Sequence, residues 1–256
     1  MTFTGLVGTV CMYPLRAIIR ASVALGIHPN TLTLIGVLIN VAAAWALGND
    51  RFLLAGLILV VANIFDFIDG KVAHITNTVS RFGAFWDSTL DRFSDIALFL
   101  GLIYLYADIR RTDYVMIAAL AMMFTIMTSY ARARAESLID TYKEVGFMQR
   151  PERIVLFMIG AFTDRMGAAL WVILVLAIVT VANRIHYTYL ALNDKPMPTG
   201  GDAVTAVFWR AFFWRDDRAT LPYDLLVIAI LAFVWLTPPD WIRDPTASGL
   251  GIWGWL

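Results

Sequence analysis

Long apolar stretches recur along this chain, and they constrain its fold more than any other feature. Candidate helices lie at residues 31–48, 52–75, 83–107, 114–138, 152–163 and 167–191. A helix needs about 20 mostly apolar residues to cross a bilayer. Hydrophobic residues make up 59% of the chain and charged residues only 16%, whereas soluble domains are about 45–50% apolar and about 25% charged. We therefore expect an all-α integral membrane protein with six transmembrane helices.

The N-terminal segment, residues 1–27, differs from these stretches. It lacks the order of a signal peptide, in which basic residues precede an apolar run. Its pattern predicts an amphipathic helix on the membrane surface, with Arg16 and Arg20 toward the lipid headgroups. A short extra membrane segment is the alternative.

The C-terminal segment, residues 193–256, mixes turn residues with Trp, Phe and Arg before a further apolar run at 223–236. Such a mixture is typical of an interfacial segment. The apolar run is short for a membrane span, so six and seven helices both remain open. We expect residues 28–192 to form the transmembrane domain, and the sequence assigns no function to the segment that follows.

The distribution of charge and the cysteine content restrict the membrane orientation, the possible disulfides and the partners of the chain. Lys and Arg fall mainly in the loops on the N-terminal side of the membrane, which by the positive-inside rule places the N-terminus and the loop between the second and third helices in the cytoplasm. The single Cys11 excludes an internal disulfide. The net charge is zero, and we expect no nucleic-acid partner.

Four aspartates lie in these apolar surroundings, namely Asp66, Asp69, Asp87 and Asp91. A charge at the bilayer centre costs about 2.5–3.5 kcal/mol on insertion scales. Four unpaired charges would therefore cost roughly 10 kcal/mol, comparable to the stability of a domain. We expect these acids to face a polar cavity in which something neutralises them.

The spacing of the acids places them on two helical faces, one formed by Asp66, Asp69, Gly70 and Ala73 and the other by Gly83, Asp87, Asp91 and Asp95. Two antiparallel helices would present these faces to each other, and the small residues would leave room for a ligand. Dense carboxylates suit Mg²⁺, which prefers oxygen ligands and often binds a substrate phosphate as well. Two such ions would support phosphoryl chemistry. Acid–base pairing within the bundle and the ion path of a transporter are the alternatives.

The same residues form a longer pattern. It resembles the CDP-alcohol phosphotransferase signature, D-x2-D-G-x2-A-R-x8-G-x3-D-x3-D, at seven of the eight positions that the signature defines. The exception is His74, which stands where the signature has Arg. This departure puts in doubt the salt bridge or nucleotide contact that the Arg makes. The resemblance covers about residues 15–192.

The resemblance implies a metal-dependent membrane enzyme that transfers a phosphatidyl-type group from CDP-diacylglycerol to an alcohol and releases CMP. Two Mg²⁺ or Mn²⁺ ions would be held by Asp66, Asp69 and Asp87. Asp91 would be the general base and would also touch the second metal. Gly70, Ala73 and Gly83 would line the cytidine site. It further implies a homodimer in a bacterial-type plasma membrane, with the active site facing the cytoplasm.

Upstream, the stretch IHPNTLTLIG resembles the family's P-N-x-x-T start of the first helix. Pro29, Asn30 and Thr33 would then border the nucleotide pocket. The alternative is a plain helix start, with Asn30 as the N-cap. Ser80 would donate its hydroxyl to the diphosphate, but it is equally well suited to a turn.

Arginines follow at Arg132, Arg150, Arg153 and Arg184. Arginines that converge on one pocket would bind the phosphate of a soluble substrate. Their stretches resemble the phosphatidylinositol-phosphate synthase branch, which implies that Arg132, Arg153 and Arg184 bind inositol 1-phosphate, with Arg150 as a helper. The alternatives are glycerol 3-phosphate as acceptor, a soluble CDP-inositol donor, and arginines that only anchor the chain in headgroups.

One neighbour complicates this arginine set. Arg132 and Arg134 are two residues apart and cannot share a helix face. We expect one to face the pocket and the other to pair with Glu136, Glu152 or a lipid phosphate. Because Arg184 lies well inside an apolar helix, we expect it to have a partner.

Overall fold

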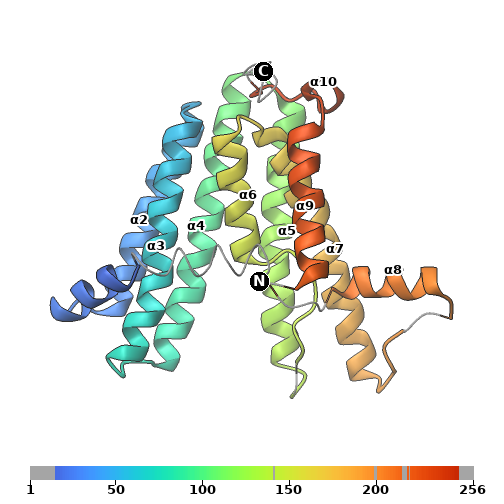
Figure 1. Cartoon of the computed structure of the whole chain (residues 1–256), viewed down its shortest axis with the longest axis horizontal. Coiled ribbons are helices and arrows are strands. Elements are labelled where there is room, and N and C mark those ends of the chain that lie inside the picture. Colours follow the sequence, from blue (N-terminus) through green and yellow to red (C-terminus); the bar gives the residue numbers. More distant parts are fainter. Residues whose placement is uncertain (1–14, 141, 199–200, 215–217, 219, 248–256) are drawn as a thin grey trace.

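The computed structural model describes residues 15–140, 142–198, 201–214, 218 and 220–247. Six helices form the main bundle: α2 (Pro29–Gly48), α3 (Phe52–Ile75), α4 (Arg81–Asp108), α5 (Thr112–Glu136), α6 (Arg150–Phe162) and α7 (Met166–Leu192). They correspond to the six predicted stretches (Figure 1). The described residues contain no strand. The predicted all-α fold is confirmed.

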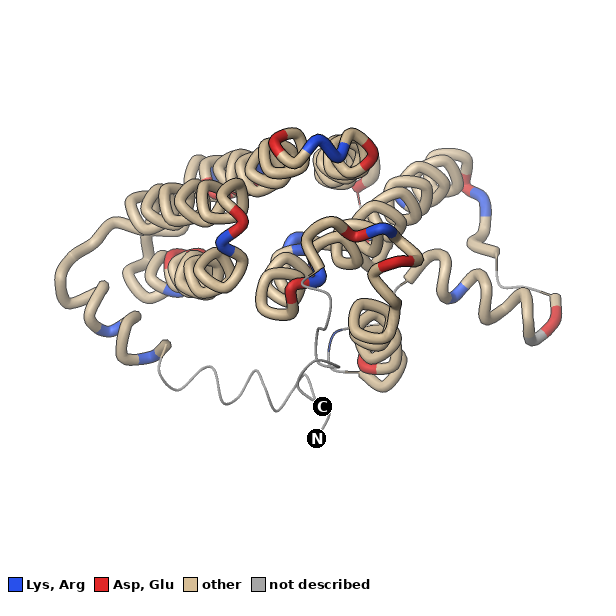
Figure 2. The backbone as a smooth tube through the Cα atoms, turned by 90° about the horizontal axis from the view of Figure 1, so that it is seen from above, with Lys and Arg blue, Asp and Glu red and all other residues tan. Residues whose placement is uncertain are grey.

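Four of these helices, α2, α3, α5 and α7, are long and apolar enough to cross a membrane. The other two helices, α4 and α6, do not combine the length and apolar character of a membrane span, each for a different reason. α4 carries the acids Asp87 and Asp91 in its first half and Asp95 near its middle, and α6 has only 13 residues. Figure 2 shows long stretches of the bundle without charged positions. Together these features describe an integral membrane bundle with a polar interior region.

The packing of the bundle leaves space between the two acid-bearing helices. α2 packs against both α3 and α4, whereas α3 and α4 have little direct contact with each other. Gly101 of α4 lies against the backbone of Ala44 in α2, so closely that a Cβ there would strike the Ala44 carbonyl. The sequence predicts that two antiparallel helices present the acids to each other. In the structure, α3 and α4 both pack against α2, which holds them in position.

The first part of the N-terminal segment, residues 1–14, lies outside the described residues. Residues 15–24 are helical. In this helix Arg16 and Arg20 are exposed while Ile19 is buried. The described part therefore has the amphipathic character that the sequence predicts.

The C-terminal segment forms α8 (Ala203–Phe213), α9 (Leu221–Leu236) and α10 (Pro239–Ile242). The predicted apolar run is helical as α9, and it packs against α7. α8 projects away from the bundle as a side arm in both views (Figures 1 and 2). Asp244 accepts a hydrogen bond from the backbone of Gly167 at 2.9 Å. The tail is thereby tied to the start of α7.

Candidate active site

Three acids meet where α3 and α4 face each other. Asp66, Asp87 and Asp91 each offer a carboxylate oxygen, and these oxygens all lie within 4.8 Å of one another. The three side chains are partly buried. Oxygen ligands gathered in a partly enclosed site are the donor set of a hard divalent cation, so this group of residues can hold a divalent metal ion.

A positive charge balances this acid group. Nη1 of Arg150, at the start of α6, lies 2.6 Å from Asp66 Oδ1 and 3.0 Å from Asp91 Oδ1. This guanidinium meets in part the expectation that something must neutralise the acids, because it pairs with two of the three. Arg150 was predicted to help bind the acceptor, and here it contacts the acids.

Asp69 lies apart from the other three acids. Its Oδ2 accepts a hydrogen bond from the Thr33 hydroxyl at 2.6 Å, and its Oδ1 accepts one from the Gly70 backbone. It is only 6% exposed. The three-acid group that can hold a metal does not include it, so its role as a metal ligand stays a prediction.

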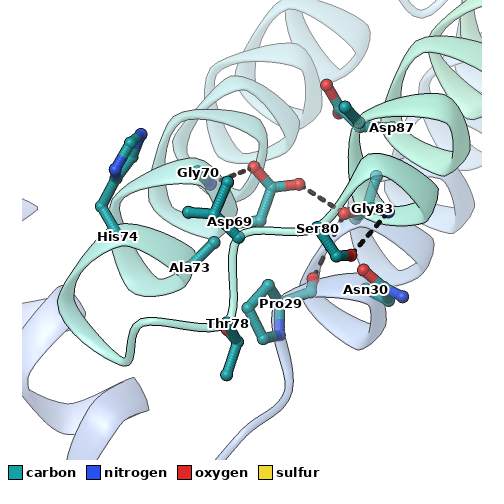
Figure 3. Close-up of a pocket in the computed structure, with 13 residues that line it drawn as sticks. Pro29, Asn30, Asp69, Gly70, Ala73, His74, Thr78, Ser80, Gly83 and Asp87 are labelled. Carbon is teal, nitrogen blue, oxygen red and sulfur yellow. Dashed lines mark hydrogen bonds between the residues drawn. The ribbon is translucent and has the colours of Figure 1, made fainter.

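A pocket of about 150 Å³ opens beside Asp69 (Figure 3). All seven residues predicted to bind the nucleotide line it: Pro29, Asn30, Thr33, Gly70, Ala73, Ser80 and Gly83. A Cβ built on Gly70 would meet nothing within 4 Å. The glycine therefore leaves open space next to the acids, as its position in the sequence predicts. We call this cavity the donor pocket.

Two helix starts shape the donor pocket. The N-cap of α2 is His28, whose Nδ1 accepts a hydrogen bond from the Asn30 backbone at 3.2 Å. The alternative in which Asn30 is the N-cap is therefore wrong, because His28 takes that place. Ser80 caps α4 by accepting a hydrogen bond from the Gly83 backbone at 3.0 Å. Ser80 thus has a structural role and also lines the pocket.

His74, the departure from the signature, also lines the donor pocket. Its side chain is exposed. Figure 3 shows its ring pointing away from Ser80 and Gly83. A His in this position leaves the acid group untouched.

A second pocket, of about 460 Å³, lies on the other side of the acids. All four predicted arginines line it, namely Arg132, Arg150, Arg153 and Arg184. Asp91 lines it too and also belongs to the three-acid group. We call this cavity the arginine pocket.

The arginines of this pocket are held by different partners. Arg153 is 1% exposed and pairs with Asp95 of α4. Arg184 is 3% exposed, and it donates to the backbone carbonyls of Val145, at 3.2 Å, and Thr128. The partner that Arg184 was expected to need is thus carbonyl oxygen.

From the sequence, one of Arg132 and Arg134 was expected to face the pocket and the other to pair with an acid or a lipid phosphate. Arg132 both faces the pocket and pairs with acids. It lines the pocket and also pairs with Glu136, at 2.8 Å, and with Glu144. Of the partners expected for the arginine that does not face the pocket, Glu136 pairs with Arg132 itself, and Glu152 pairs with Arg218 at 2.7 Å. Nη1 of Arg134 donates a hydrogen bond to the Ser137 hydroxyl at 3.4 Å.

Sequence reasoning missed several residues of the arginine pocket. The four-residue spacing placed Asp95 on the acid face of its helix, but the sequence analysis gave it no role in this pocket. Arg218 lies in the C-terminal segment and gives no signal in the sequence, because only the fold brings it to the pocket.

Comparison with known proteins agrees with this arrangement. The sequence model of the CDP-alcohol phosphatidyltransferase family matches residues 26–183. An archaetidylinositol phosphate synthase of Pyrococcus horikoshii is 34% identical over 173 residues, covering 68% of this chain and 89% of the relative. A phosphatidylinositol phosphate synthase of Mycobacterium tuberculosis is 31% identical over 199 residues, covering 72% of this chain and 91% of the relative.

Two crystal structures of phosphatidylinositol phosphate synthase from Mycobacterium tuberculosis share the fold at 26% identity. The one with CDP-DAG bound has a TM-score of 0.64 and covers 68% of this chain and 93% of that one. The one in complex with manganese and citrate has a TM-score of 0.65 and covers 75% and 98%. This chain therefore belongs to the CDP-alcohol phosphatidyltransferase family and is a membrane transferase.

Proposed function

We propose that this protein transfers a phosphatidyl group from CDP-diacylglycerol to inositol 1-phosphate and releases CMP. The arrangement of the two pockets carries the proposal. The donor pocket and the arginine pocket follow one another along α4, and the three acids lie between them. A transferase needs two substrates held on either side of the reacting bond.

The names of the relatives support the same acceptor class. The relatives reported above are named for the synthesis of inositol phosphate lipids, and one related structure is described with CDP-DAG bound. Glycerol 3-phosphate is the second candidate acceptor. The large arginine pocket, with an arginine on each of several elements, favours the bulkier phosphorylated polyol.

Divalent ions fit the acids. We propose two Mg²⁺ or Mn²⁺ ions bound by Asp66, Asp69, Asp87 and Asp91, of which three already have their oxygens within 4.8 Å of one another. A related structure holds manganese. When bound, such ions screen the diphosphate charge and stabilise CMP as the leaving group.

Asp91 is the residue placed to accept the proton of the acceptor hydroxyl. It is shared by the three-acid group and the arginine pocket. An acceptor whose phosphate lies among the arginines would therefore extend its hydroxyl toward this carboxylate. A general base must come within hydrogen-bond reach of the proton that it takes.

The arginines bind and orient the acceptor. Arg153 and Arg184 are buried and each is fixed by a partner, so little rotamer freedom remains to be lost on binding. Arg132 lies on the α5 wall, and Arg150 lies beside Asp91 at 3.0 Å. Guanidinium groups suit phosphate because they offer paired N–H donors in one plane.

The donor nucleotide occupies the other pocket. Its cytidine would lie against Gly70, Ala73 and Gly83, where small residues leave room. Ser80 and Asn30 would offer polar groups to it from the helix starts. The lipid tails would remain in the bilayer around the bundle.

An acceptor screen tests this function. Detergent-purified protein is incubated with labelled CDP-diacylglycerol, Mn²⁺ or Mg²⁺, and one of inositol 1-phosphate, inositol or glycerol 3-phosphate. We expect CMP release and a new labelled lipid with inositol 1-phosphate, and neither without metal. A product only with glycerol 3-phosphate would select the second candidate. Metal-dependent binding of CDP-diacylglycerol without CMP release in the presence of any of the acceptors would oppose the proposal.

Two further features of the proposal concern the assembly in the membrane. The arginine-rich loops support an active site on the cytoplasmic side, which labelling of single cysteines from either side of the membrane would test. We also propose a homodimer, which light scattering of the detergent-solubilised protein would test. A monomer under conditions of full activity would oppose it.

A further inference from the structure

One wall of the arginine pocket comes from outside the family core. The family match ends at residue 183, and Arg218 lies in the segment between α8 and α9. This arginine nevertheless lines the same pocket as Arg132, Arg150, Arg153 and Arg184. The C-terminal segment thus reaches back to the site that the core builds.

Arg218 is held at the start of α6. Its Nε lies 2.7 Å from Glu152 Oε1 and its Nη2 lies 3.2 Å from Glu152 Oε2. Nη2 also donates to the Gln149 side chain at 3.1 Å. Two parallel N–H···O contacts of this kind fix the plane of a guanidinium as well as its position.

Glu152 is itself buried and doubly engaged. It is 8% exposed, and its Oε1 also accepts a hydrogen bond from the Tyr223 hydroxyl at 3.0 Å. Burial opposes the charged form of Arg218, but the hydrogen bond and charge of Glu152, together with Tyr223, outweigh it and raise the pKa of the guanidinium. Arg218 therefore remains a cation at the rim of the pocket.

The side chains that line this pocket carry more positive than negative charge, while three acids outside the lining pair with lining arginines: Asp66 with Arg150, Glu144 with Arg132 and Glu152 with Arg218. Six arginines line it, namely Arg92, Arg132, Arg150, Arg153, Arg184 and Arg218, against three acids, Asp91, Asp95 and Glu136. Arg218 differs from Arg153 and Arg184 because its side chain is 53% exposed. An arginine has five N–H donors, and the contacts with Glu152 and Gln149 use three of them. Donors therefore remain for a ligand that enters the pocket.

We propose that Arg218 binds the anionic group of the phosphorylated acceptor, so that the C-terminal segment completes the acceptor site. The proposal rests on the proposed function, in which this pocket takes a phosphorylated polyol. Glu152 and Gln149 hold the guanidinium in place, and Tyr223 supports Glu152 from α9. The residue raises the affinity for acceptors that carry a phosphate over acceptors that do not.

The test compares variants of the full chain in detergent. Arg218→Ala should raise the KM for inositol 1-phosphate about 10-fold, which corresponds to the loss of one charge-assisted contact, and leave the KM for CDP-diacylglycerol unchanged. Inhibition by inorganic phosphate should weaken by a similar factor. Arg218→Lys should recover part of the loss, because it restores the charge without the paired donors.

Two control variants separate binding from a purely structural latch. Lys195→Ala removes another exposed cation of the same segment, one that contacts Tyr189 and lies in neither pocket, and it should behave as wild type. Tyr223→Phe keeps Arg218 but removes one hydrogen bond from the Glu152 that holds it, so it should raise the acceptor KM by less than Arg218→Ala does. An unchanged acceptor KM in Arg218→Ala would overturn the proposal. Equal rises in the acceptor KM and the donor KM of Arg218→Ala, reproduced by Tyr223→Phe, would also overturn the proposal, because they would indicate a purely structural role.

The failure of the proposed function would look different. In that case the wild type releases no CMP with any acceptor, and binding is measured instead by thermal shift with inorganic phosphate and with inositol 1-phosphate. Stabilisation of the wild type that is lost in Arg218→Ala would support anion binding by Arg218 without turnover. Equal stabilisation of both proteins would overturn it.

Discussion

Nη1 of Arg150 lies 2.6 Å from the carboxylate of Asp66. The same nitrogen reaches Asp91 at 3.0 Å, so one side chain of α6 joins the acids of α3 and α4. A divalent ion at these carboxylates would share them with a cation that is already in place. The ion and the Arg150 guanidinium would both be positive, and like charges close together repel where water is largely excluded.

We expect Arg150→Gln to bind Mn²⁺ more tightly than wild type. Without the guanidinium, Asp66 and Asp91 are freed for the ion, and the midpoint of a Mn²⁺ titration followed by electron paramagnetic resonance should fall about 3- to 10-fold. The acceptor KM should rise in the same variant. An unchanged or higher midpoint would show that Arg150 does not compete with the metal.

Asp91→Asn should abolish turnover while CDP-diacylglycerol binding persists. The amide keeps the size of the side chain but cannot take a proton from the acceptor hydroxyl. CMP release and labelled-lipid binding are measured on the same preparation. Asp113→Asn, which changes an exposed acid in the first turn of α5, is the matched control. Turnover by Asp91→Asn near the wild-type rate would remove Asp91 as the base.

Asp66→Asn tests the metal assignment separately. Because one ligand loses its charge, the concentration of Mg²⁺ or Mn²⁺ needed for half-maximal CMP release should rise at least 10-fold. Asp113→Asn again serves as the control. A metal titration that matches wild type would contradict the assignment of Asp66.

Gly70→Ala should weaken donor binding without weakening the fold. The added Cβ meets nothing within 4 Å, so it intrudes only on the volume that the nucleotide would occupy. We expect the KM for CDP-diacylglycerol to rise about 10-fold while the melting temperature does not fall, because Ala is a better helix former than Gly. Gly201→Ala, which also meets nothing within 4 Å but lies in neither pocket, should leave both quantities unchanged. An unaffected donor KM would place the nucleotide elsewhere.

Arg184→Ala should raise the acceptor KM far more than the donor KM. It also removes the hydrogen bonds to the carbonyls of Val145 and Thr128, each worth about 1.5–3 kcal/mol for a charged donor, so the melting temperature should fall. Arg184→Lys retains the charge and should recover part of both losses. A selective effect on the donor would show that Arg184 serves the other pocket.

Gly101→Ala should destabilise the bundle. The new Cβ would strike the Ala44 carbonyl, which is backbone and cannot rotate away. Overpacking of this kind costs about 1–3 kcal/mol, and thermal unfolding in detergent would measure it against Gly70→Ala. Equal melting temperatures for the two variants would mean that α2 and α4 separate easily.

The sequence was sufficient for the fold because its periodicity and length are strong signals. The apolar stretches set the order of the six bundle helices, and the family resemblance of the acidic stretch implied Gly70, Ala73 and Gly83 as residues of the donor pocket. The resemblance to the phosphatidylinositol-phosphate synthase branch also implied that the arginines meet, and they do so from three elements. The division of the chain at residues 28 and 192 stays a prediction.

The partners of the charged residues could not be predicted in this way. Arg184 is satisfied by carbonyl oxygens, and Glu152 is paired with a residue 66 positions later. Such pairs depend on how helices rotate and pack, which no spacing within one helix encodes. The cap of α2 was misassigned for a smaller reason, because His28 can accept a hydrogen bond as Asn can.

α4 passes both pockets as one unbroken helix, with Gly83 and Asp87 lining the donor pocket and Asp91 and Asp95 lining the arginine pocket. A slide or rotation of this helix would therefore displace the groups that serve both substrates at once. Substrate preference can change separately only through the other walls, from α2 and α3 on one side and from α5, α6, α7 and the C-terminal segment on the other. Engineering a new acceptor for this enzyme should begin on those walls and leave α4 unaltered.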